Sequence, residues 1–254
     1  MVKLKFIIDE PYLLADAVLI DPYFTIKNRE DFMYLRNISD IIRIEREYFF
    51  SYKSKISYKI FKSLEQKLKG ALKDDGKLQR FYQKILEETQ DYKREITAEW
   101  SSNYLRSVRM MENITRLEWD DNKEFEVYLI HPSSAIARYL GSNRIVVGMD
   151  KEKNNDYTII LWHELMHSKF HLYDSSFSND ISHSIIILVT ENELRSRLNG
   201  GNYPPFFDSD QDLSIIMKKI LPYWRVYLKS ERDNILEFER KMQCRMKEFL
   251  IGVK

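Results

Sequence analysis

Apolar residues recur at helical spacing over long stretches of the chain. Between Asp31 and Phe50 they are Phe32, Leu35, Ile38, Ile41, Ile42 and Ile44. A spacing of three to four residues places them on one face of a helix. Similar patterns predict helices over Tyr58–Leu72, over Leu78–Leu117 with at most one break, and over Asp208–Leu250 with a break or kink at Pro222. Seven Gly and six Pro in 254 residues provide few helix breakers, which also favours long helices.

The middle of the chain has a different pattern. Phe125–His131 and Arg144–Met149 are rich in β-branched and aromatic residues, which predicts two strands. Lys3–Ile8 predicts a third strand, followed by a short helix with Pro11 in its first turn. The segment Ser133–Asn143 is expected only to join the two central strands.

Helical periodicity returns after the polar region Asp150–Asp156. It predicts one helix over Tyr157–Leu172 and a second over Asp180–Leu198, which ends before Gly200. The expected fold class is mostly α with a small β-sheet. We expect one compact unit with three regions along the chain: an N-terminal helical region (1–117), a core (118–205) and a C-terminal helical region (206–254).

Charge and composition restrict the class of protein. Lys and Arg number 40 and Asp and Glu 39, so the chain lacks the basic surplus with which nucleic-acid binders neutralise phosphates. No run approaches the roughly 18 apolar residues of a membrane span, and Met1–Glu10 lacks a signal-peptide core. The one cysteine, Cys244, cannot form an internal disulfide and suits a reducing compartment. We therefore expect a cytoplasmic protein that binds neither nucleic acid nor membrane.

All five histidines lie between His131 and His183. Two of them, His163 and His167, belong to the run His-Glu-Leu-Met-His, and a helix would project both from one face about one turn apart. Two imidazoles at this spacing can ligate one tetrahedral Zn²⁺ ion. Glu164, directly after the first histidine, can reach a water on that ion and act as general base.

The ordinary explanation is two histidines on a helix with no metal. The residues around the motif argue against it, because most of them are apolar: Ile159, Ile160, Leu161, Trp162, Leu165 and Met166. They predict a helix buried on most sides, where imidazoles and a carboxylate are costly unless they are paired or metal-bound. We therefore expect one zinc ion per chain.

With this motif and its context, the chain resembles the zincin metalloproteases. The resemblance covers Phe125–Leu198, where strand, strand, HExxH helix and a second helix follow in the order of that family. It implies a zincin-like core between long flanking helices, and hydrolysis of a peptide bond in a peptide or protein substrate. It also implies that one of the two strands, Arg144–Met149 before the other, is an edge strand that pairs with the substrate.

The third zinc ligand distinguishes the branches of this family. The metzincin pattern HExxHxxGxxH is not met, and His171 lies too far along the helix to share the ion, so it is expected near the helix end or behind a ligand. The gluzincin, or thermolysin-like, branch takes a Glu from the next helix. This implies Glu191, with Glu193 and His183 as alternatives. Arg195 stands where thermolysin has an acidic residue behind its ligand, which leaves that supporting role unassigned.

Helical spacing supports Glu191 before Glu193. Glu191 shares a predicted face with apolar residues and would point inward, whereas Glu193 would point elsewhere: the apolar residues are Ile187, Leu188, Leu194 and Leu198. A Tyr or His above the metal is also needed to stabilise an oxyanion, and Tyr203 and His183 are candidates.

Two other functions stay open. One is a regulatory protease that cuts a single partner protein. The other is a non-catalytic binding or regulatory protein with structural zinc. Glu164 favours an enzyme over the second alternative, because a structural site has no need of a carboxylate at that position.

Overall fold

The computed structural model describes residues 2–20, 34, 36–42, 58–74, 76–119, 123–170, 176–200 and 211–251. The chain forms two compact units. The sheet unit comprises Lys3–Thr97 and Lys123–Asp150, and the helical unit comprises Met1–Val2, Ala98–Asn122 and Lys151–Lys254. The fold is mostly α with a small β-sheet, which confirms the expected class. The two units divide the chain at other positions than the three regions expected from the sequence.

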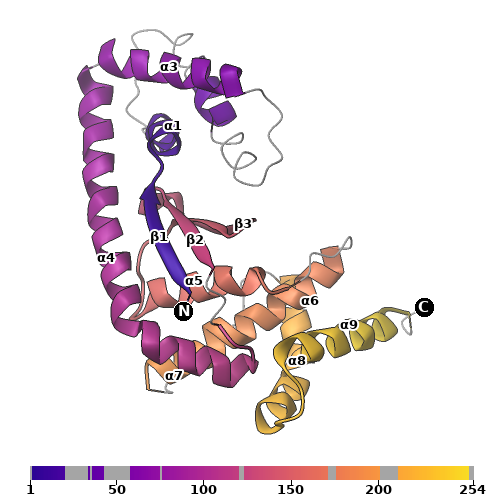
Figure 1. Cartoon of the computed structure of the whole chain (residues 1–254). Coiled ribbons are helices and arrows are strands. Elements are labelled where there is room, and N and C mark those ends of the chain that lie inside the picture. Colours follow the sequence, from indigo (N-terminus) through magenta and orange to yellow (C-terminus); the bar gives the residue numbers. More distant parts are fainter. Residues whose placement is uncertain are drawn as a thin grey trace. The chain divides into compact units, whose positions relative to one another are not determined.

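Among the described residues, the sheet unit contains four strands in the order β1-β2-β4-β3. Figure 1 labels β1, β2 and β3 of this sheet. The strands are β1 (Lys3–Ile8), β2 (Glu124–Leu129), β3 (Ile136–Gly141) and β4 (Arg144–Gly148). β1, β2 and β4 are parallel, with Lys3 paired to Glu124, and β3 lies antiparallel to β4. Three of these strands confirm the three predicted from the sequence.

β4 is an interior strand, with β2 on one side and β3 on the other. Ile145, Val146 and Val147 are all buried, as is typical of a strand covered on both faces. At its end, a Cβ on Gly148 would lie 2.4 Å from Ile130 Cγ1, so only glycine fits there. The expectation that Arg144–Met149 is an edge strand is therefore wrong.

The segment before β4 is more than a connection. It forms the short 3₁₀ helix η1 (Pro132–Ser134) and then β3, which occupies an edge of the sheet. Ser142 and Asn143 join β3 to β4 with φ angles of 48° and 59°, the two positive values that a two-residue type I′ hairpin needs. This strand was not predicted from the sequence.

Helices pack against the core of the sheet unit. α1 (Glu10–Ile20) begins after Asp9, whose Oδ1 accepts a hydrogen bond from Tyr12 N at 2.9 Å. The Tyr12 ring packs against sheet residues. Leu14 and its neighbours pack against Leu68 of α3 (Tyr58–Asp74). Of the helix predicted over Asp31–Phe50, the described residues 34 and 36–42 are helical.

α4 (Gly76–Thr115) is one continuous helix of 40 residues, which starts in the sheet unit and ends in the helical unit. The helical unit continues with α5 (Asp156–His167), α6 (Ser176–Ile187), the π-helical segment η2 (Leu188–Leu194), α7 (Arg195–Leu198), α8 (Gln211–Lys229) and α9 (Ile235–Ile251). Pro222 lies inside α8 and does not end it. The C-terminal helical pattern is interrupted at 230–234 instead. No helix among the described residues is long and apolar enough to cross a bilayer.

Three tryptophans form the centre of the helical unit. The ring of Trp162 on α5 lies 5.5 Å from that of Trp100 on α4 and 4.9 Å from that of Trp119, measured between centroids. Trp162 and Trp119 are almost fully buried. Because Trp162 directly precedes His163, this aromatic contact fixes the rotation of α5 about its axis, and with it the direction of the histidines.

Candidate metal centre

His163 and His167 lie on the same side of α5, as the sequence predicted. Their ring centroids are 5.2 Å apart. α5 begins at Asp156, whose Oδ2 accepts a hydrogen bond from Glu152 N at 2.9 Å and another from Lys153 N. This carboxylate closes the turn before the helix and so fixes where the helix starts.

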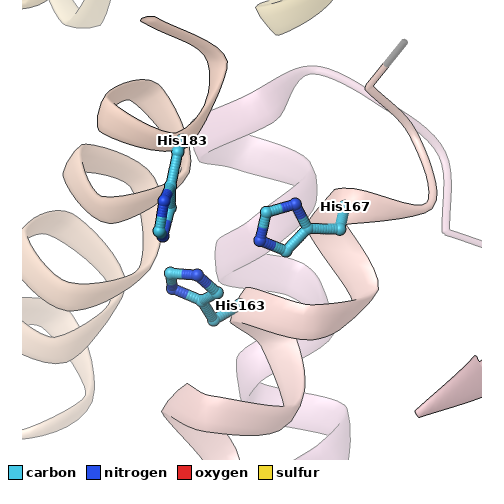
Figure 2. A group of neighbouring side chains, drawn as sticks. All are labelled: His163, His167 and His183. Carbon is cyan, nitrogen blue, oxygen red and sulfur yellow. The ribbon is translucent and has the colours of Figure 1, made fainter. Parts of the chain in front are cut away.

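His183 of α6 completes a cluster of three imidazoles. Its ring centroid lies 5.1 Å from that of His163 and 5.4 Å from that of His167. One potential ligand atom from each of the three side chains lies within 4.8 Å of the other two. Figure 2 shows the three rings pointing toward a common space between α5 and α6. This arrangement could hold one metal ion.

Polar contacts between α6 and α9 hold the helix that carries His183. Ser182 Oγ donates to Glu239 Oε1 at 2.8 Å, and Gln243 Nε2 donates to Ser178 O at 2.7 Å. Ser178, Ser182, Glu239 and Gln243 are all buried. Buried hydrogen bonds of this kind favour one rotation of α6, because any other leaves polar groups unpaired.

Two of the three imidazoles, those of His163 and His167, are held in the neutral form. Burial, together with the neighbouring His167 and His183, holds the pKa of His163 well below its ordinary value. Burial and the nearby His183 lower the pKa of His167 to about 4. Both rings are therefore neutral at pH 7, the state in which imidazole ligates a metal. Imidazole nitrogen is a common ligand of Zn²⁺, which is bound tetrahedrally in proteins.

Glu164 follows His163 on α5 and is buried, with 4% of its surface exposed. It is not one of the three clustered ligand groups. The predicted base thus lies next in the chain to a member of the cluster and away from bulk solvent.

Glu191, placed first among the candidates for the third ligand, is not a member of the cluster. It lies in η2, where its Oε2 accepts from Arg195 Nη2 at 2.5 Å and from Arg195 Nε at 3.2 Å. Its Oε1 lies 3.9 Å from Nδ1 of His163. Burial raises the pKa of the Glu191 carboxyl, and the Arg195 guanidinium opposes that shift. Glu191 is therefore a neighbour of one clustered histidine.

Of the other candidate site residues that the structure describes, one belongs to the cluster. Glu193 Oε1 accepts from Arg197 Nε at 2.7 Å and is not part of the cluster. His183, the least favoured of the three alternatives, is the one that joins the two motif histidines. Tyr203 and His171 lie outside the described residues.

Three residues near the cluster were given no functional role in the sequence-based prediction: Thr190, Arg195 and Asp156. Thr190 Oγ1 lies 3.5 Å from His163 Nδ1. Arg195 joins Glu191 to Asp156, with which it forms a second buried ion pair. The spacing of four between Glu191 and Arg195 is the one sequence signal for this group, since residues four apart meet on a helix.

A comparison of the chain with protein-family models, with curated proteins and with solved structures found no match. The residues of the site therefore carry the functional argument.

Proposed function

We propose that this protein is a zinc-dependent peptidase that uses His163, His167 and His183 as metal ligands and Glu164 as general base. The observation that supports it best is the meeting of three imidazoles, two of them on the HExxH helix, within 4.8 Å. His183 takes the place first given to Glu191, because it is the group that lies beside both motif histidines.

Each residue has a defined task in the proposed reaction. The three histidines bind zinc, which when present supplies a Lewis acid and lowers the pKa of a bound water to about 7. Glu164 takes a proton from the attacking water and delivers it to the departing amine of the peptide. Its side chain is buried away from bulk water.

An open coordination position favours catalysis over a purely structural metal. Structural zinc sites are almost always closed by four protein ligands. Among the residues that the structure describes, the cluster offers three ligands, and Glu164, which follows His163, is not one of them. The choice of peptides as substrates rests on the resemblance of the HExxH segment to zincins, and the hydrolytic chemistry rests on the donor set.

The test combines metal analysis with an activity assay on the full chain. The purified protein, loaded with zinc and passed through a desalting column, should retain one zinc per chain by mass spectrometry. It should cleave a mixed peptide library, with cleavage abolished by a chelator and restored by zinc. His131→Gln serves as control, because His131 belongs to the sheet unit and pairs with Glu88 at 3.0 Å. Absence of stoichiometric zinc overturns the metal site; retained zinc without any hydrolysis overturns the peptidase.

A further inference from the structure

The Nδ1 atom of His163 faces two oxygen atoms, both from the π-helical segment η2. Thr190 Oγ1 lies 3.5 Å from it and Glu191 Oε1 lies 3.9 Å from it. Both distances exceed that of a short N–H···O bond, so a small rotation of the ring toward either oxygen completes one. The side chain of His163 is only 14% exposed, which leaves little room for water to take this role.

The hydrogen-bonding state of Thr190 determines what it can offer to the ring. Its hydroxyl donates to Ile186 O at 2.8 Å, and Thr190 is fully buried. A hydroxyl carries one proton. With that proton committed to a carbonyl, Thr190 Oγ1 can only accept a hydrogen bond from the imidazole.

The Glu191 carboxylate can likewise only accept a hydrogen bond from the imidazole of His163. Arg195 donates to its Oε2 through both Nε and Nη2, which stabilises the ionised carboxylate. An ionised carboxylate accepts hydrogen bonds and donates none. Its Oε1, the oxygen nearer His163, is therefore a second acceptor beside Nδ1.

From these contacts we infer that Thr190 and Glu191 are positioning residues that fix His163 as the Nδ1–H tautomer and leave Nε2 free to bind the metal. Two acceptors beside one ring nitrogen place the proton on that nitrogen, and the other then carries the lone pair. This inference rests on the proposed zinc site. It assigns Glu191 a role behind a ligand, in place of the ligand role that the sequence favoured.

The shape of η2 explains how two consecutive residues reach the same atom. Its hydrogen bonds run from residue i to i+5, which widens the turn compared with an α-helix. Single π-helical turns within α-helices are frequent at functional sites. Arg195 then fixes Glu191 from behind through its second ion pair, to Asp156 at the start of α5.

The tautomer can be observed without metal or substrate. Long-range proton–nitrogen correlation spectra of the full chain labelled with ¹⁵N-histidine distinguish the two neutral tautomers, and His163→Gln assigns the His163 signals. In metal-free protein at pH 7.5, His163 should be the Nδ1–H tautomer, and this should persist with zinc on Nε2. An Nε2–H tautomer, or zinc on Nδ1, overturns the inference.

Zinc affinity, measured by competition with a chromophoric chelator, provides the second test. Thr190→Val removes the acceptor at nearly constant size, Thr190→Ser restores it, and Glu191→Gln removes the charge. Val and Gln variants should bind zinc about 10- to 100-fold more weakly, the usual loss for residues behind a ligand, while Ser should bind as the native chain does. Glu193→Gln is the matched control, because Glu193 pairs with Arg197 instead.

The outcomes separate this inference from the proposed function. Equal losses for Glu191→Gln and Glu193→Gln, or no loss for Thr190→Val and Glu191→Gln, overturn the positioning role. A changed Co²⁺ absorption spectrum in Glu191→Gln overturns it too, because a positioning residue leaves the ligand set intact. Weakened zinc binding with the Nδ1–H tautomer supports the inference even where the native chain hydrolyses no peptide, a result that overturns only the peptidase.

Discussion

Arg195 of α7 forms a buried ion pair with Asp156, the first residue of the helix that carries the two motif histidines. The same guanidinium holds Glu191 in η2. One side chain thus links the start of α5 to the segment that contacts His163. The side chains of Arg195, Asp156 and Glu191 are 9%, 8% and 15% exposed, so solvent cannot easily replace any of them.

Arg195→Met should destabilise the protein strongly. The substitution replaces the guanidinium with an unbranched apolar side chain and leaves two buried carboxylates without their cation, which typically costs about 3–5 kcal/mol. Arg197→Met is the matched control, because the Arg197–Glu193 pair is 33% and 25% exposed and should contribute about 0–1 kcal/mol. Urea unfolding followed by circular dichroism measures both free energies. Equal losses in the free energy of unfolding would show that the buried Arg195 pairs stabilise the protein no more than the Arg197–Glu193 pair does.

His183→Ala should weaken zinc binding more than Glu191→Gln does. Removal of a direct ligand leaves two imidazoles from one helical turn, whereas loss of a supporting group costs only about 10- to 100-fold in affinity. Isothermal titration of the metal-free variants with zinc gives the ranking. The reverse order would return Glu191 to the ligand role that the resemblance to gluzincins implied.

Glu164→Gln should retain zinc and lose activity. The amide keeps the size of the side chain but cannot take a proton at neutral pH, so peptide hydrolysis should fall by about 10²- to 10⁴-fold. The measurement pairs kcat on a cleaved peptide with zinc content per chain. A variant with unchanged kcat removes Glu164 from the mechanism, and a variant without zinc makes it part of the metal site.

The metal-free protein should lose stability as the pH falls below about 6.5, the pKa of an exposed histidine. The pKa values of His163 and His167 are lowered in the folded state, that of His167 to about 4, so the unfolded chain binds more protons in this range. From about pH 6.5 down to about pH 4, each histidine should reduce the free energy of unfolding by up to about 1.4 kcal/mol per pH unit. Above about pH 6.5 these two histidines should not make the free energy of unfolding depend on pH.

Urea unfolding in a chelating buffer across this range measures the dependence. His167→Gln carries no titrating ring at that position, so its stability should depend less steeply on pH than that of the native sequence. Identical slopes for the two proteins would show that His167 is not buried in its neutral form.

The sequence predicted the helix of the site better than its surroundings. The HExxH spacing predicts that His163 and His167 share a face because the α-helical period is well defined, and α5 fulfils this. The preference for Glu191 over His183 came from the resemblance to gluzincins, and the inward direction expected of Glu191 came from carrying the same period through the next helix. In that helix the π-helical turns of η2 change the number of residues per turn, and no residue type predicts such turns.

The strands show a similar division. The apolar run Arg144–Met149 predicted a strand correctly, but such a run does not identify its neighbours. Its interior position depends on β3, which the analysis missed because Arg138 and the partly exposed residues around it lack a clear apolar face. The positive φ angles at Ser142 and Asn143 make the hairpin possible, yet only Asn has a marked preference for them.

The pairing of Lys3 with Glu124 has a consequence for the biogenesis of the protein. β1 leaves the ribosome long before its partner β2 has been translated, and a parallel pair so distant in sequence closes slowly. Until then Lys3–Ile8 lacks its partner strand, and an unpaired apolar segment of this kind can associate with other nascent chains. Lys3 and Lys5, whose charges repel a second copy of the same strand, stand at alternate positions along it and limit self-association during synthesis.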